Sequence, residues 1–67
     1  MTRVRDLVEG DFIMWNQNVY KIPLLVISIT LWGAKDILGR ELAGVILLTP
    51  AGPRQFTLTD GAFKKVN

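Results

Sequence analysis

The chain has 67 residues, of which 49% are hydrophobic and 21% are charged, and its formal net charge at pH 7 is +2. It contains neither cysteine nor histidine, which excludes disulfides, zinc or haem sites built on those ligands, a thiol nucleophile and a Ser-His-Asp triad. Residues 1–67 make one small domain, whose core stabilises it by a narrow margin. With disulfides and such metal sites excluded, oligomerisation is the remaining usual way to reinforce so small a core.

The N-terminal residues carry charge but precede no apolar segment of the kind found in secretory signals. The longest apolar run, Ile22 to Trp32, contains Pro23, Ser28 and Thr30 and is too short to cross a bilayer as a helix, which takes about 20 residues. We therefore expect a buried strand here and no membrane span. By default, this predicts a cytoplasmic protein or a component of a viral particle.

Short apolar runs separated by turn residues predict an all-β domain. The first predicted strand, Asp11 to Trp15, leads into Asn16-Gln17-Asn18, which suits a tight hairpin because asparagine tolerates left-handed backbone angles. The second predicted strand runs from Val19 to about Leu31 and is dominated by β-branched and aliphatic residues. Pro23 indicates an edge or a bend within it.

The central segment from Gly33 to Gly44 supports two interpretations. A helix of one to two turns would explain the spacing of its apolar residues and would place Asp36 and Arg40 as an i,i+4 pair. Gly39 interrupts that helix, however, and Gly39-Arg40 would equally serve as a hairpin turn. We favour a loop or hairpin.

Three further strands are predicted after this segment. Val45 to Thr49 is a compact apolar run, and residues 50–53, Pro-Ala-Gly-Pro, supply the turn that follows it. Arg54 to Thr59 alternates between polar and apolar residues, so one of its faces is expected in the core. Asp60-Gly61-Ala62 predicts a tight turn before a short last strand, Phe63 to Val66.

Five short strands around a variable central loop or short helix resemble the small Src-homology-3-like barrel. More narrowly, Leu-Val-Glu-Gly-Asp-Phe-Ile at 7–13, followed after a short turn by Val-Tyr-Lys-Ile at 19–22, is similar to the opening hairpin of the KOW-type N-terminal domain of elongation factor P. The resemblance implies a five-stranded barrel and nucleic-acid or ribonucleoprotein binding. That family's Pro-Gly-Lys-Gly loop is replaced here by Trp32 to Asp36, so the resemblance does not extend to the loop lysine.

Leu31 and Trp32 are the predicted protein interface. Trp32 adjoins Gly33 at the start of the variable segment, where we expect it to be exposed, and exposed tryptophans are typical interface anchors. A small chain with so many apolar residues must leave some of them at its surface. The leading prediction is a non-enzymatic binding module that docks through an apolar strand face into a larger homo- or hetero-oligomeric assembly, such as a viral particle.

Basic residues support the alternative function, nucleic-acid or ribonucleoprotein binding. The predicted contacts to phosphate lie near the two ends of the chain, which approach each other in small domains, with one further arginine between them: Arg3, Arg5, Arg54, Lys64 and Lys65. A solvated surface that keeps an apolar protein soluble is the plainer interpretation of the same residues.

The carboxylates show no spacing typical of an acid–base pair, and the chain has no side chain that titrates near neutrality without a large pKa shift. Asp11 and Asp60 are better explained as turn residues. We therefore expect no enzymatic activity, no catalytic residue, no metal and no cofactor.

Overall fold

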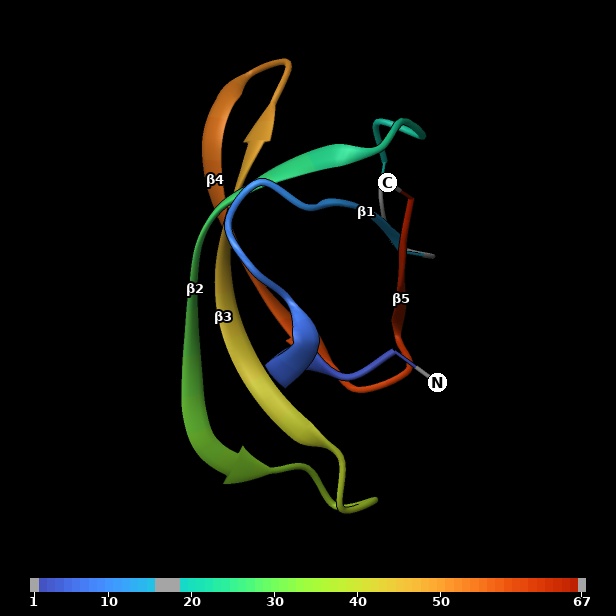
Figure 1. The fold of residues 1–67 in the computed structure, drawn as a ribbon, viewed down its shortest axis with the longest axis vertical. Coiled ribbons are helices and arrows are strands. Elements are labelled where there is room, and N and C mark those ends of the chain that lie inside the picture. Colours follow the sequence, from blue (N-terminus) through green and yellow to red (C-terminus); the bar gives the residue numbers. More distant parts are fainter. Residues whose placement is uncertain (1, 16–18, 67) are drawn as a thin grey trace.

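The computed structural model describes residues 2–15 and 19–66. Five strands form one antiparallel sheet in the order β4-β3-β2-β1-β5 (Figure 1): β1 (Phe12–Trp15), β2 (Leu24–Lys35), β3 (Glu41–Thr49), β4 (Gly52–Thr59) and β5 (Phe63–Lys65). A single 3₁₀ turn, η1 (Val4–Asp6), precedes them, and there is no α-helix within the described ranges. The all-β prediction is confirmed.

The long strand β2 lies in the middle of the sheet and joins β1 on one side to β3 on the other. Its first residues pair with β1, where Ile13 lies opposite Leu24, and the rest of the strand pairs with β3 as far as Lys35 opposite Glu41. An irregular register between Val26 and Ser28 marks a bulge, a feature that bends a strand. Figure 1 shows β2 and β3 strongly curved, with η1 lying against their concave side.

Strands β4 and β5 form the two edges of this sheet, and no backbone pairing joins them among the described residues. The sheet is therefore curved but not closed by hydrogen bonds, and the complete Src-homology-3-like barrel stays a prediction. One aromatic contact connects β1 with the edge strand β4, because the rings of Trp15 in β1 and Phe56 in β4 meet edge to face with centroids 5.1 Å apart. This geometry is favourable for aromatic pairs.

The core occupies the concave side of the sheet. It consists of ten buried apolar residues: Val4, Leu7, Ile13, Leu24, Val26, Ala43, Val45, Leu47, Leu58 and Phe63. In β3, every second side chain from Ala43 to Leu47 enters it, as expected for a strand with one buried face. Val4 and Leu7, which precede the first strand, pack onto the concave side of the sheet, so the N-terminal segment is part of the hydrophobic core.

The predicted start of the second strand is wrong. Val19 and Tyr20 lie in a turn and Lys21 has a φ of 58°, a left-handed conformation that cannot continue a strand. The strand begins only at Leu24, directly after Pro23. The tight turn predicted at 16–18 lies outside the described residues.

The central segment is a hairpin, as favoured, and the helical interpretation is wrong. Strands β2 and β3 extend further than predicted, to Lys35 and from Glu41, and residues 36–40 form the turn. The N–H of Gly39 donates to the carbonyl of Asp36 at 3.0 Å, and Gly39 has a φ of 77°, which glycine adopts without strain. Pairing of the flanking strands therefore outweighs the helical spacing of the segment.

Candidate functional site

The outer face of the sheet is its convex side, opposite the core. Its residues alternate with the core residues along the strands, except at the bulge of β2: Leu25, Ser28, Thr30 and Trp32 of β2, Leu42, Gly44, Ile46 and Leu48 of β3, and Pro53, Gln55, Thr57 and Thr59 of β4. Trp32, Ile46 and Leu48 are 49%, 38% and 46% exposed. Large apolar side chains thus lie at the surface on two neighbouring strands.

Trp32 is held on the outer face by its neighbour in β3. Thr30 lies opposite Gly44, and the indole two residues further along β2 covers Gly44 so closely that a Cβ there would be 2.8 Å from Nε1. The side chain therefore packs on one surface and is open on the other. Its predicted exposure is confirmed, and its contact with a partner stays a prediction.

Leu31 belongs to the other side of the sheet. It lies opposite the fully buried Ala43, on the concave face, where it is 47% exposed beyond the end of the core. Successive residues of a strand point to opposite faces, so Leu31 and Trp32 do not form one patch. The structure instead groups Trp32 with Ile46 and Leu48. Alternation along the predicted strand Val45 to Thr49 places Ile46 and Leu48 on one face, but only the register of β2 against β3 brings Trp32 to that face.

Two of the predicted phosphate-binding side chains form ion pairs with carboxylates of the chain. Arg5 forms an ion pair with Glu41 at 3.0 Å, and this hydrogen bond raises the pKa of the guanidinium above its ordinary value. Lys65 lies 3.2 Å from the buried carboxylate of Asp11 and also donates to the carbonyl of Asp6. Both side chains therefore join the N-terminal segment to the sheet.

The five predicted cations do not form one patch. Lys64 and Lys65 lie opposite Met14 and Ile13, so as strand neighbours they point to opposite faces of the sheet. Arg54 is five residues before Thr59 on β4, a span of about 17 Å at the usual rise of about 3.3 Å per residue. It is therefore remote from the β4–β5 turn, where the N-terminal segment is bound.

A different basic cluster surrounds a depression of about 360 Å³ beside the β2–β3 turn. The depression is lined by four basic residues, two acidic residues and two further residues of the turn: Arg3, Arg5, Lys35, Arg40, Glu41, Asp60, Leu38 and Gly39. Lys35 and Arg40 were not predicted as site residues. Their approach to the N-terminus depends on contacts between remote segments, and the sequence carries no local signal for it.

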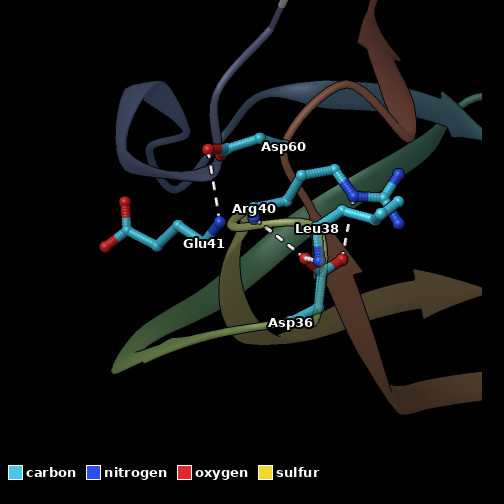
Figure 2. Close-up of polar contacts among 5 residues, drawn as sticks. All are labelled: Asp36, Leu38, Arg40, Glu41 and Asp60. Carbon is cyan, nitrogen blue, oxygen red and sulfur yellow. Dashed lines mark hydrogen bonds and ion pairs between the residues drawn. The ribbon is translucent and has the colours of Figure 1, made fainter.

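The β2–β3 turn is fastened by Asp36 (Figure 2). Its carboxylate accepts hydrogen bonds from the backbone N–H of Leu38 and Arg40, at 3.0 and 2.8 Å, and from Arg40 Nε at 2.8 Å. The backbone N–H of Arg40 is the main reason that the pKa of Asp36 is lowered. The turn is thus held by hydrogen bonds among its own polar groups, while Ile37 at its tip is fully exposed.

Asp60 is a turn residue, as predicted, but it also fastens two remote segments. Its two carboxylate oxygens accept from the N–H of Val4 at 2.8 Å and from the N–H of Glu41 at 3.4 Å, the second of which Figure 2 shows. The N–H of Gly61 donates to the carbonyl of Thr2. The β4–β5 turn therefore binds both the N-terminal segment and the start of β3.

The fold and these surfaces define an all-β protein with one five-stranded antiparallel sheet. No protein-family model matches the chain, and neither the curated proteins nor the solved structures include a match. Across residues 2–15 and 19–66, no helix is long and apolar enough to span a membrane, and no group of three acidic side chains is placed to hold a metal ion. The likeness to elongation factor P stays a prediction.

Proposed function

We propose that the protein is a non-enzymatic binding module that docks through its outer face into a larger homo- or hetero-oligomeric assembly, of which a viral particle is one example. The observation that carries the proposal is the grouping of Trp32, Ile46 and Leu48 on the convex side of β2 and β3, each more than a third exposed. The buried core lies on the concave side, so these three side chains lie outside it.

The chemistry around these residues suits a protein interface. Ser28, Thr30, Gln55 and Thr57 border them on the same face and carry no charge. Interfaces typically combine an apolar centre with a polar rim and few charged groups at the centre. Fully burying one large apolar side chain contributes about 1.5–3 kcal/mol, so covering the remaining exposed part of three such side chains would stabilise a complex by a few kcal/mol.

The proposal is tested by sedimentation velocity over a range of protein concentrations. We expect the wild-type chain to sediment as a concentration-dependent oligomer, and the double variant Ile46→Lys, Leu48→Lys to sediment as a folded monomer. Ile37→Lys is the matched control, because it removes a fully exposed apolar side chain at the β2–β3 turn, away from the outer face. Equal loss of association in both variants would contradict a specific role for the outer face.

The basic cluster favours a second candidate function, nucleic-acid binding. Arg3 and Lys35 line the depression beside the β2–β3 turn, whereas Arg5 and Arg40 there are already paired with Glu41 and Asp36. Binding of a fluorescent single-stranded oligonucleotide should weaken as salt is raised. Arg3→Gln with Lys35→Gln should reduce that salt dependence more than the control pair Arg54→Gln with Lys64→Gln. Salt-independent binding would contradict this function.

A further inference from the structure

We infer that the tip of the β2–β3 turn inserts into the surface of an anionic lipid bilayer, where its aliphatic side chains enter the acyl boundary and neighbouring cations contact headgroup phosphates. The contact involves one leaflet only, and it goes beyond the protein interface proposed for the outer face. It starts from two consecutive large aliphatic residues at the tip, Ile37, which is fully exposed, and Leu38, which is 71% exposed.

The turn lies where a flat surface can reach it. The molecule extends 32 Å along its longest axis and 19 Å along each of the other two. In Figure 1, where the longest axis is vertical, the β2–β3 turn lies at the lower end, beyond η1 and the β4–β5 turn. A bilayer is a flat partner, so side chains at such an end can enter it before the rest of the molecule meets the surface.

Hydrogen bonds within the turn prepare its backbone for this environment. The carboxylate of Asp36 accepts from the N–H of Leu38 at 3.0 Å and from the N–H of Arg40 at 2.8 Å (Figure 2), and it is paired with Arg40 Nε at 2.8 Å. Polar groups are costly to bring to hydrocarbon unless they are bonded within the protein. A turn that is already fixed also loses less conformational entropy on binding.

Basic side chains adjoin the apolar tip. Leu38 lines the same depression of about 360 Å³ as Arg3 and Lys35. Across the described ranges, neither of these two cations forms an ion pair with a carboxylate of the chain. A lipid phosphate in the depression would therefore meet both cations while the aliphatic tip beside it enters the acyl boundary.

The charge around the tip is positive by a small margin. With Asp36 of the turn included, the four basic side chains at the depression face three carboxylates, which leaves a net charge of +1. Two of the cations are already paired with two of these carboxylates, as Arg5–Glu41 and Arg40–Asp36. The third carboxylate, Asp60, accepts hydrogen bonds from backbone N–H groups. We therefore expect the apolar tip to contribute more to lipid binding than charge does.

This combination of groups favours lipid over a nucleic acid at the turn. The phosphates of a nucleic acid would pair with Arg3 and Lys35 but would leave the side chain of Ile37 in water. An anionic bilayer supplies phosphates and an apolar layer beneath them. Amphipathic elements bind bilayers in this way, with apolar side chains at the headgroup–acyl boundary and basic ones among anionic headgroups.

Co-sedimentation with vesicles of phosphatidylcholine and phosphatidylserine in equal parts tests the inference. Wild type should pellet with the vesicles and stay in solution without them. Ile37→Ser should weaken binding by about tenfold or more, because it removes a large apolar side chain from the buried tip. Val19→Ser is the matched control and should bind as wild type does, since Val19 is 80% exposed and belongs to residues 19–23, drawn in teal near the opposite end of the molecule (Figure 1).

The cations are tested with the same vesicles. Arg3→Gln with Lys35→Gln should weaken binding by roughly fivefold for each cation removed, and should leave binding to pure phosphatidylcholine vesicles unchanged. The charge-matched control, Arg54→Gln with Lys64→Gln, should have a smaller effect. A loss of equal size in both pairs would show that the overall charge of the protein attracts it to the vesicles, and would overturn the role of the depression.

A fluorescent label reports insertion directly. Because the chain contains no cysteine, Ile37→Cys and Val19→Cys each provide one site for an environment-sensitive fluorophore. On addition of the mixed vesicles, emission from position 37 should shift to shorter wavelength and be quenched by lipids with brominated acyl chains, whereas emission from position 19 should change little. These substitutions lie at exposed positions, and circular dichroism checks that each variant is folded.

Three results would overturn the inference. One is a wild-type chain that does not bind the mixed vesicles, and another is an equal loss of binding in Ile37→Ser and Val19→Ser. The third is binding that Arg3→Gln with Lys35→Gln abolishes but Ile37→Ser leaves unchanged, without a fluorescence shift at position 37, which would assign the cluster to phosphate contacts alone. The outer face is tested by association in the absence of lipid, so each proposal stands or fails separately.

Discussion

The indole of Trp32 lies against the backbone of Gly44 on the neighbouring strand, so that any side chain at position 44 would meet it at 2.8 Å. Gly44 sits in the middle of β3 with an ordinary strand conformation, where glycine is usually unfavourable. It is required here for space and not for backbone freedom, because an aromatic ring on an adjacent strand covers it. This contact determines which surface of Trp32 remains available to a partner.

Gly44→Ala should destabilise the protein because the new Cβ must displace the indole. We expect a loss of about 1–3 kcal/mol in the free energy of unfolding, the usual cost of overpacking, measured by urea denaturation followed by circular dichroism. In a Trp32→Ala background the same change should be neutral or stabilising by about 0.5–1 kcal/mol, since alanine is favoured over glycine in a strand. An equal cost in both backgrounds would show that the indole is not what excludes a side chain at position 44.

Asp60→Ala should destabilise the protein by separating the N-terminal segment from the sheet. The N–H groups of Val4 and Glu41 would lose a charged acceptor in a partly buried site, and such hydrogen bonds contribute about 1.5–3 kcal/mol. Asp60→Asn, which keeps one carbonyl oxygen, should lose less. The free energy of unfolding and the exchange rate of the Val4 amide measure the effect. Asp6→Ala, a change at an exposed carboxylate of η1, is the control and should alter neither quantity appreciably.

The β2–β3 turn should loosen in acid. Because the pKa of Asp36 is lower in the folded chain than its ordinary value of about 3.9, the ionised carboxylate stabilises the fold fully above that ordinary value. This contribution is lost as pH falls through the lowered, folded-state pKa. We expect the amides of Leu38 and Arg40 to lose exchange protection in that range, and Asp36→Asn to be weakly protected at every pH. A wild-type turn whose protection does not change with acid would disprove the role of the charge.

Local sequence patterns were enough to predict the all-β class of the fold and several of its turns. Alternation along Arg54 to Thr59 and the turn residues Asp60-Gly61 are local features, and the turn lies where they predict. β4 ends at Thr59 as predicted but begins two residues earlier, at Gly52, so Gly52 and Pro53 belong to the strand and not to the predicted turn. The i,i+4 spacing of Asp36 and Arg40 also corresponds to a real ion pair, at 2.8 Å. That spacing is compatible with a hairpin turn as well as with a helix, and for this reason the segment could not be assigned from its residues alone.

The composition of the surfaces, by contrast, depends on long-range packing. It separated Leu31 from Trp32, paired Arg5 with Glu41 across 36 positions of sequence, and placed Lys35 near Arg3 in a cluster that no spacing indicates. The register of β2 against β3 and the fastening of the N-terminal segment by Asp60 produce these arrangements. Local patterns report the conformation and the buried face of one segment, whereas a surface is built from segments that long-range packing brings together.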